Sequence, residues 1–199
     1  MRLHQYLNEF YDGDEDIAKK RISLIEKNCQ PFLKQMKSIN FEDDNLLFSG
    51  RWDRTEFTKK KVRKNRRPKD TSIDIHDWVD NWFYKKFGIK ARSNTIFCTS
   101  HKGYALSYGN LFVIFPIGKF EVIWSSRLKD LFNKADMNRG LEKWSKNFLE
   151  FNAKTYKKGD LQGAIKSENE IMLHCKEYYL LKFDPLTNAM VLNYFMETL

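Results

Sequence analysis

A short acidic motif is the part of the sequence best suited to chemistry. Glu168 and Glu170 stand two residues apart, immediately before the apolar run Ile171–Leu173. Because alternate residues of a strand point to one face, we expect both carboxylates on the same side of a strand entry. Such a pair suits a reaction in which one carboxylate stabilises an oxocarbenium ion on a ribose and the other activates the incoming nucleophile. A solvent-facing acidic strand end would show the same two residues.

A second group of residues combines hydroxyls with an aromatic side chain. Thr99 and Ser100 follow the apolar run Thr95–Cys98, and Tyr108 stands before Gly109. This order predicts a strand, a turn and a short helix that closes at Gly109. The hydroxyls can hold a ribose at the strand end, and the tyrosine can stack on a flat ring. An ordinary helix N-cap with a tyrosine in the core gives the same pattern.

Positive charge is concentrated in one segment. The 199 residues carry a formal net charge of +9, with 35 Lys and Arg against 26 Asp and Glu, and seven of the 35 lie between Lys59 and Arg67. We expect 51–69 to form an exposed loop that contacts an acceptor such as a phosphate backbone, with Trp52 and Phe57 near enough to stack on bases. A solvated loop without a partner is the alternative. The candidate acceptor-binding residues are Lys59, Lys60, Lys61, Arg63, Arg66 and Arg67.

Composition indicates a folded globular chain. Apolar residues make up 42% and aromatic residues 15%, which is enough for a hydrophobic core at this length. No apolar run is long enough to cross a bilayer, and Met1–Phe10 lacks the pattern of a secretory signal, so we expect a cytoplasmic monomer without membrane contact. The three widely spaced cysteines and four scattered histidines predict neither disulfides nor a metal site. Gly-rich phosphate loops and a nucleophile elbow are absent, which disfavours Rossmann enzymes and P-loop NTPases.

Hydrophobic periodicity predicts helices in the first half and strands in the second, which favours a single α+β domain over regular βαβ units. The expected helices are a short one through Leu3, Leu7 and Phe10 that stops at Gly13, a long one from Asp14 to Met36 with a kink at Pro31, one from Thr71 to Gly88, a short one before Gly109, and two near 126–134 and 139–151. The expected strands are Leu46–Gly50, Thr95–Cys98, Leu111–Phe115, Phe120–Trp124, Glu170–Cys175, Tyr178–Phe183 and Ala189–Tyr194, with a hairpin at Pro116–Gly118 and a polar loop at Lys157–Lys166. Residues 1–44 form the helical part of the domain and 45–199 its core.

Taken together, three motifs resemble those of ADP-ribosyltransferases of the arginine, serine/threonine, glutamate type, a family that includes bacterial toxins and phage enzymes. In that family a Glu-x-Glu opens a strand that pairs with the next strand through a short hairpin, and SENEIMLHCKEYYLL at 167–181 has this form. The family's strand, hydroxyl turn and helix match Phe97–Ser100 followed by Ala105–Gly109. The family's early arginine precedes a glycine, whereas LLFSGR places Gly50 before Arg51.

The resemblance, which runs from about Asn45 to Phe183, implies a mostly antiparallel, split sheet around an NAD cleft. The implied catalytic residues are Glu170, which stabilises the ribose cation, and Glu168, which orients or deprotonates the acceptor. The implied NAD-binding residues are Arg51 on the pyrophosphate, Thr99 and Ser100 on the ribose side, and Tyr108 on nicotinamide. Arg54, Arg66 and Arg67 are alternatives to Arg51.

The resemblance therefore implies transfer of ADP-ribose from NAD to a protein side chain or a nucleic acid, with release of nicotinamide and no metal. The main alternative is a non-catalytic nucleic-acid-binding protein that uses the segment 59–67, with salt-sensitive affinity and no NAD turnover. A metal-dependent nuclease built on Asp70, Glu121 and Glu168 is disfavoured, because the carboxylates show no recognisable spacing to a lysine.

Overall fold

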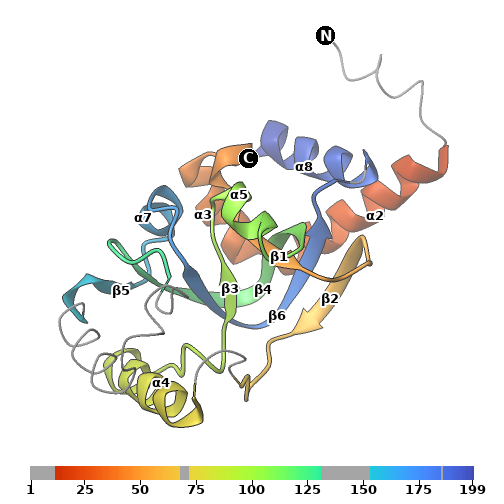
Figure 1. The fold of residues 1–199 in the computed structure, drawn as a ribbon. Helices are drawn as coiled ribbons and strands as arrows, with labels where there is room; N and C mark the ends of the chain where they lie inside the picture. Colours follow the sequence, from red (N-terminus) through yellow and green to blue (C-terminus); the bar gives the residue numbers. More distant parts are fainter. Residues whose placement is uncertain (1–11, 68–71, 131–152, 185) are drawn as a thin grey trace.

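Two long antiparallel strands form the centre of the fold. The computed structural model describes residues 12–67, 72–130, 153–184 and 186–199 (Figure 1). The central strands are β4 (Asn110–Ser125) and β6 (Ile171–Lys182), which pair along most of their length. The short strands β1 (Phe48–Arg51) and β5 (Tyr156–Lys158) pair with β4, and β2 (Phe57–Lys61) and β3 (Ile96–Cys98) pair with β6. All of these pairings are antiparallel, which confirms the expected α+β fold with a mostly antiparallel sheet.

A backbone bridge connects the two outer edges of this sheet. Phe48 and Thr99 exchange backbone hydrogen bonds of 2.7 and 2.9 Å, which places the end of β3 beside β1. The Ser49 hydroxyl adds a hydrogen bond of 3.1 Å to the carbonyl of Phe97. Strand pairing therefore runs from β1 through β4, β6 and β3 and returns to β1. At this end of the sheet the neighbouring strands are β1, β3 and β6.

Helices cover the sheet from both sides. Figure 1 shows α2 (Asp12–Asn28), α3 (Gln30–Ile39) and α8 (Leu186–Thr198) together on one side and α4 (Ile73–Phe87) at the other end of the molecule. Two helices are shorter: α5 (Lys102–Leu106) follows β3, and α7 (Leu161–Lys166) precedes β6. Single turns of 3₁₀ helix lie at Asp43–Asn45 and Ala153–Thr155.

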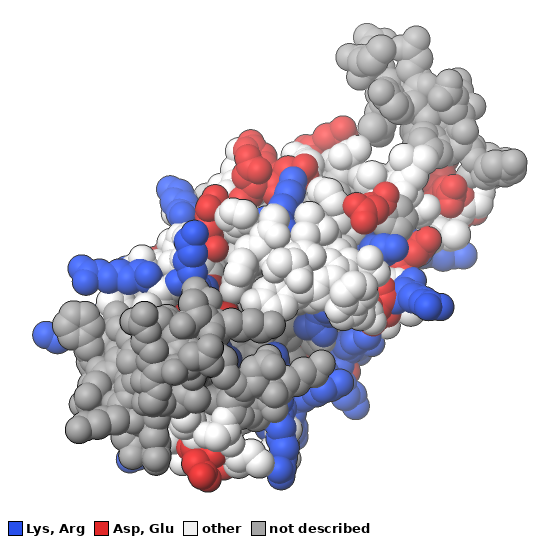
Figure 2. Space-filling view, in the orientation of Figure 1, with Lys and Arg blue, Asp and Glu red and all other residues white. Residues whose placement is uncertain are grey.

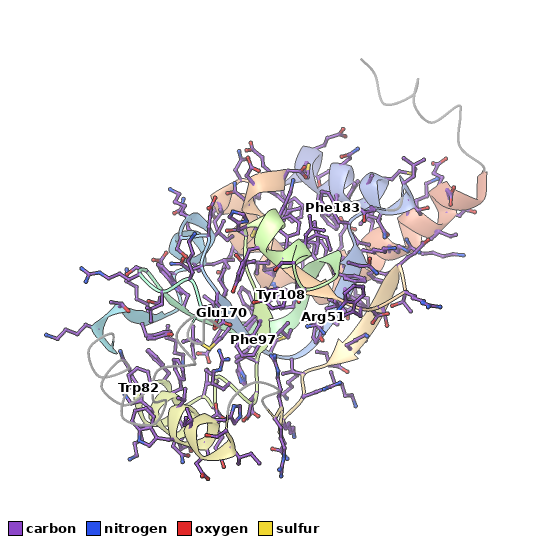
Figure 3. All side chains as sticks on the ribbon, viewed as in Figure 1. Arg51, Trp82, Phe97, Tyr108, Glu170 and Phe183 are labelled. Carbon is purple, nitrogen blue, oxygen red and sulfur yellow. The ribbon has the colours of Figure 1, made fainter. Side chains whose placement is uncertain are left out.

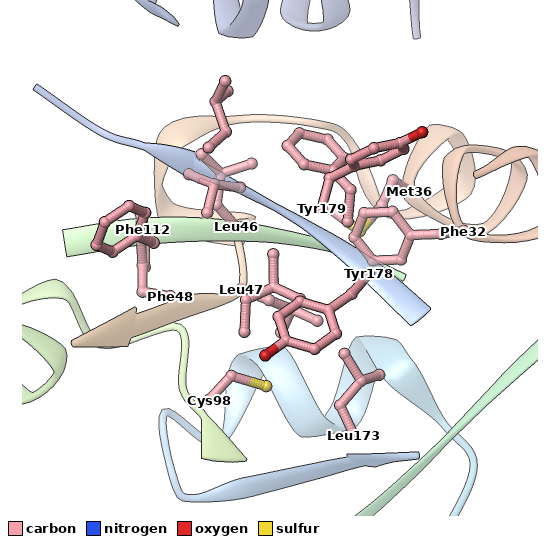
Figure 4. Packing of buried hydrophobic residues seen from close by; sticks show 14 of the residues in the cluster. Phe32, Met36, Leu46, Leu47, Phe48, Cys98, Phe112, Leu173, Tyr178 and Tyr179 are labelled. Atoms are coloured by element: carbon pink, nitrogen blue, oxygen red, sulfur yellow. The ribbon is translucent and has the colours of Figure 1, made fainter. Parts of the chain in front are cut away.

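The buried apolar side chains form two clusters. The larger joins α2, α3 and α8 to the strands, and Figure 4 shows part of it, with Phe32 and Met36 of α3 beside the sheet. The smaller lies under α4, where Val79 and Phe83 pack with Met172 of β6. Each fully buried side chain of this size contributes about 1.5–3 kcal/mol by leaving water. The smaller cluster holds α4 next to the entry of β6.

The helix expected from Thr71 to Gly88 is confirmed as α4. Its apolar residues recur every three or four positions, and Gly88 ends it in the left-handed region at φ 74°. The N-cap is Ser72, whose hydroxyl accepts from the amide of Ile75 at 3.4 Å, while Thr71 lies outside the described residues. The sequence signals for this helix were all local, which is why they were sufficient.

The N-terminal helix is divided where we expected a kink. It ends at Asn28, and α3 begins at Gln30 with Pro31 in its first turn, a position where the missing amide costs nothing. Gly13, expected to stop an earlier helix, lies inside α2, and residues 1–11 are outside the described ranges.

Both expected hairpins are wrong. β4 runs through Pro116–Gly118 as one strand, with a register shift between Ile117 and Phe120 that accommodates Gly118 at φ 68°. β6 likewise continues through Lys176, so the expected strands 170–175 and 178–183 are one element. The physical reason is that each long strand offers the other a full row of backbone partners, and a bulge absorbs the turn residues.

Three other expectations are corrected by tertiary packing. Residues 57–61 of the expected loop form β2, because they pair with β6 from Leu181 to Glu177. The expected loop at 157–166 contains part of β5 and α7. The expected strand 189–194 lies in α8, whose residues Val191 and Phe195 are one helical turn apart and buried. The expected helix at 139–151 and most of that at 126–134 lie outside the described residues, and 126–130 are not helical.

Candidate active site

Glu170 stands at the entry of β6 in a largely buried position. Its amide donates to the carbonyl of Lys129 at 2.8 Å, and its side chain is 16% exposed. Oε1 accepts a hydrogen bond of 2.9 Å from Nη1 of Arg92, whose side chain is 13% exposed. Burial raises the pKa of Glu170 to about 7, against the lowering effect of Arg92. The carboxyl group can therefore gain or lose a proton near neutral pH.

Arg92 is held by a buried polar network on α4. Asp80 accepts hydrogen bonds from the amides of Arg92 and Ser93, at 2.7 and 3.2 Å, and from the Ser93 hydroxyl. His76, one turn earlier on α4, contacts the Ser93 hydroxyl at 3.1 Å through Nε2. The turn after α4 is thus fixed by side chains of the helix, and it directs Arg92 toward Glu170.

The ring of Phe97 in β3 makes cation–π contacts with two guanidinium groups. The Cζ atoms of Arg66 and Arg92 lie 4.1 and 4.4 Å from the centroid of its ring. The Arg66 amide also donates to the carbonyl of Ser93 at 3.3 Å, which ties the segment after β2 to the turn after α4. Burial of the guanidinium and repulsion by Arg92 lower the pKa of Arg66 to about 10. It stays charged at neutral pH.

Arg51 lies at the end of β1, and hydrogen bonds to two side chains hold its guanidinium in place. Nε donates to the Ser49 hydroxyl and Nη1 to the hydroxyl of Tyr178, each at 3.1 Å. Cζ lies 5.5 Å from the Tyr178 ring. Arg51 also acts electrostatically on Arg66, so the two side chains lie in one positive region. Figure 3 labels Arg51, Phe97 and Glu170 near the middle of the molecule.

Two tyrosines of the α5 region border this group. Tyr108 is 52% exposed, and its ring meets that of Tyr104 edge to face at 5.5 Å, with 3.1 Å between the hydroxyls. Tyr104 donates to Oδ2 of Asp130 at 3.1 Å, and Asp130 in turn helps raise the pKa of Glu170. A Cβ on Gly50 would meet the Tyr108 Cβ at 2.9 Å, so Tyr108 lies directly over β1.

The two members of the acidic motif differ in exposure. Glu168 is exposed and has a positive φ of 55°, so strand alternation does not extend to it. Both residues precede β6, which begins at Ile171, so the strand alternation on which that expectation was based does not apply to them. Glu170 faces the arginines, and the Glu168 carbonyl accepts a hydrogen bond of 2.9 Å from the Thr99 hydroxyl.

The hydroxyl groups of Thr99 and Ser100 stabilise the backbone around the site. Thr99 and Ser100 are both buried, and the Ser100 hydroxyl donates to the carbonyl of Ile165 at the end of α7. Together with the bond from Thr99 to Glu168, this contact fixes the segment that leads into β6. The helix that follows is capped by His101, whose Nδ1 accepts from the Tyr104 amide at 3.0 Å.

The basic segment divides into two groups of side chains. Lys59 pairs with Glu177 at 2.7 Å, and Lys60 pairs with Asp53. The cations that end and follow β2 are exposed residues: Lys61, Arg63, Lys64, Arg66 and Arg67. Of these, Arg66 turns its guanidinium onto the Phe97 ring.

Sequence reasoning missed Arg92, Tyr178 and Asp130 as site residues. Arg92 is 78 residues from Glu170, and no spacing in the sequence connects them. The available signal was an arginine just before the strand of Phe97, which is too common to identify a site.

No group of three or more His, Cys, Asp or Glu within the described ranges could hold a metal ion. A cavity of about 420 Å³ lies elsewhere, between α3, β4 and α7, with Gln35, Val122 and Leu161 in its lining. Among the described helices, none combines the length and apolar character needed to span a membrane.

No family model, curated protein or solved structure matches the chain.

Proposed function

We propose that this protein is an ADP-ribosyltransferase that moves ADP-ribose from NAD to a macromolecular acceptor. One observation supports this above the others. Arg51, Thr99 and Glu170, which stand for the three motifs of the resemblance, come from β1, the end of β3 and the entry of β6, and these are neighbouring strands. The two expected hairpins and the paired carboxylates do not contribute, so the proposal rests on this placement and on the charges around Glu170.

The charges fit the parts of NAD. Arg51 and Arg66 supply the guanidinium groups that suit a pyrophosphate, which accepts paired hydrogen bonds from such groups. Tyr108 offers an exposed ring for nicotinamide, and Thr99 acts by fixing the loop before β6. Because Arg51 and Arg66 share one positive region, the proposal assigns the pyrophosphate to both.

Glu170 would carry the chemical step. In its ionised form it stabilises positive charge on the ribose as the bond from C1′ to the nicotinamide nitrogen breaks, and nicotinamide leaves as a neutral molecule. The acceptor nucleophile then bonds to C1′, and its proton passes to the Glu170 carboxylate, whose pKa of about 7 suits a base at neutral pH. Arg92 keeps the carboxylate oriented through its hydrogen bond.

Glu170→Gln tests this assignment. The amide keeps the size of the side chain but lacks the negative charge, so we expect transfer of labelled ADP-ribose in cell extract to fall by about two orders of magnitude or more. NAD binding, measured by calorimetry, should change little. Glu168→Gln is the matched control and should retain NAD hydrolysis within a few-fold, because Glu168 is exposed. Near-normal turnover by Glu170→Gln would overturn the proposed function. Protease and nuclease digestion of the labelled product identifies the acceptor class.

A further inference from the structure

The exposed cations after β2 are held in place at the rim of the site. At one end of the segment the Val62 amide donates to the carbonyl of Lys176 at 3.1 Å, and at the other the Arg66 amide donates to Ser93. Residues 61–67 contain five cations and no acid. The segment is therefore a positively charged rim anchored to β6 and to the turn after α4.

This rim is electrostatically continuous with the arginines around Glu170. The guanidinium groups of Arg66 and Arg92 lie over the same Phe97 ring, at 4.1 and 4.4 Å from its centroid. The charges of Arg51 and Arg63 also act on Arg66. Positive charge thus extends from the largely buried Arg92 to exposed Arg63. Figure 2 shows Lys and Arg side chains along the lower right of the molecule, beside an uncharged surface. A polyanion that binds the rim would be led toward Glu170.

One exposed aromatic side chain lies in the connection that precedes the basic segment. Trp52 is 90% exposed in the connection from β1 to β2, and the next residue, Asp53, pairs with Lys60 of β2. A tryptophan this exposed contributes no buried apolar area to the hydrophobic core. Surfaces that combine exposed aromatic rings with cations bind single-stranded nucleic acids, because unpaired bases stack on the rings while the phosphates contact the cations.

We propose that the acceptor is a single-stranded nucleic acid, bound along residues 61–67 with a base stacked on Trp52. This inference rests on the proposed function: a nitrogen or oxygen of a nucleotide near Glu170 would bond to C1′ of the ribose, nicotinamide would leave, and the proton would pass to Glu170. A single strand fits better than a duplex, because its bases are free to stack and to react.

Binding can be measured without NAD. Fluorescence anisotropy with labelled 12-nucleotide single-stranded RNA and DNA, over a range of salt concentrations, should show affinity that falls with salt. In Lys61→Ser/Arg63→Ser/Lys64→Ser the slope of log affinity against log salt should become shallower by about 2, from about 0.7 per lost phosphate contact. Trp52→Ala should weaken binding about tenfold. The control Lys20→Ser/Lys27→Ser/Lys34→Ser removes three exposed cations from α2 and α3 and should bind within about twofold of wild type.

The outcomes separate this inference from the proposed function. Equal losses in the two triple variants, or no effect of Trp52→Ala, would overturn the assigned surface. Binding of a poly-glutamate peptide as tight as that of the oligonucleotides would overturn it in favour of an acidic protein. If NAD turnover depends on Glu170 but no oligonucleotide binds, the inference about the acceptor fails while the proposed function stands. If oligonucleotides bind as expected but no NAD is turned over, the proposed function fails while the binding surface stands.

Discussion

At the residue scale, Glu170 is defined by competition between burial and charge. Removal from water favours the neutral acid, and Arg92 favours the carboxylate. Burial has the larger effect, which leaves the pKa near 7. A carboxyl group in this state can shift its charge when a ligand excludes water or brings phosphates to the arginines. Residue type and strand position were sufficient to single out Glu170, but its partner Arg92 depends on a fold-level contact that local spacing does not encode.

Glu170 also makes stability depend on pH. Its pKa is higher in the folded protein than the ordinary 4.5, so the folded state binds the proton more tightly, and this stabilisation is full below pH 4.5 and is lost as the pH rises through 7. We expect Glu170 to lower the free energy of unfolding by about 3 kcal/mol between pH 4.5 and pH 8. Urea denaturation at several pH values checks this, with Glu170→Gln flattening the decline.

The control for the pH series is Glu168→Gln, which makes the same chemical change at an exposed position. His76 titrates in the opposite sense, since burial lowers its pKa and stability from that group rises with pH. Subtracting the curve of Glu170→Gln from that of wild type removes the His76 contribution. A difference that does not vary with pH would contradict the account of Glu170.

At the element scale, helices and strands were predicted correctly where the signals in the sequence were local, and wrongly where distant residues decide the structure. α4 was predicted because its cap, its period and its closing glycine are all local. The hairpin at Pro116–Gly118 was wrong because a proline and a glycine mark a turn and a bulge equally well, and only the partner strand β6 decides between them. Residues 189–194 read as a strand from their apolar and aromatic content, and packing against the rest of the core makes them helical.

The contact between α4 and the site gives a prediction for Asp80. Asp80→Ala removes the acceptor for two buried amides and the Ser93 hydroxyl, so we expect the free energy of unfolding to fall by about 2–4 kcal/mol. Arg92 should also hold Glu170 less firmly, which raises the pKa of Glu170 further. Urea denaturation measures the first effect, and carboxyl carbon NMR of labelled Glu170 measures the second.

Asp77→Ala is the control for Asp80, because Asp77 lies on the same helix and is exposed. It should change stability by no more than about 0.5 kcal/mol and leave the titration of Glu170 unmoved. If Asp80→Ala lowers stability but leaves the pKa of Glu170 unchanged, Asp80 serves the fold of the turn and does not position Arg92.

At the scale of the whole molecule, chain segments far apart in sequence meet at one buried amide. Asn188 of α8 is 0% exposed. Its Nδ2 donates to the carbonyls of Lys182 and Glu56, at 2.8 and 3.2 Å, and its Oδ1 accepts from Arg21 of α2. One side chain thus joins α2, α8, the end of β6 and the connection before β2. A sequence pattern cannot reveal such a residue, because its role appears only when all four segments are in place.

We expect Asn188→Ala to lower the free energy of unfolding by about 2–4 kcal/mol, because it leaves two carbonyls and the partly buried Arg21 without this partner. Asn193→Ala, an exposed position on the same helix, should be neutral within about 0.5 kcal/mol. Since Asn188 connects distant segments, the loss should shift the whole transition, so that tryptophan fluorescence and far-ultraviolet circular dichroism report the same lower midpoint. Separate midpoints for the two signals would show that α8 detaches on its own, and Asn188 would then stabilise only the end of the chain.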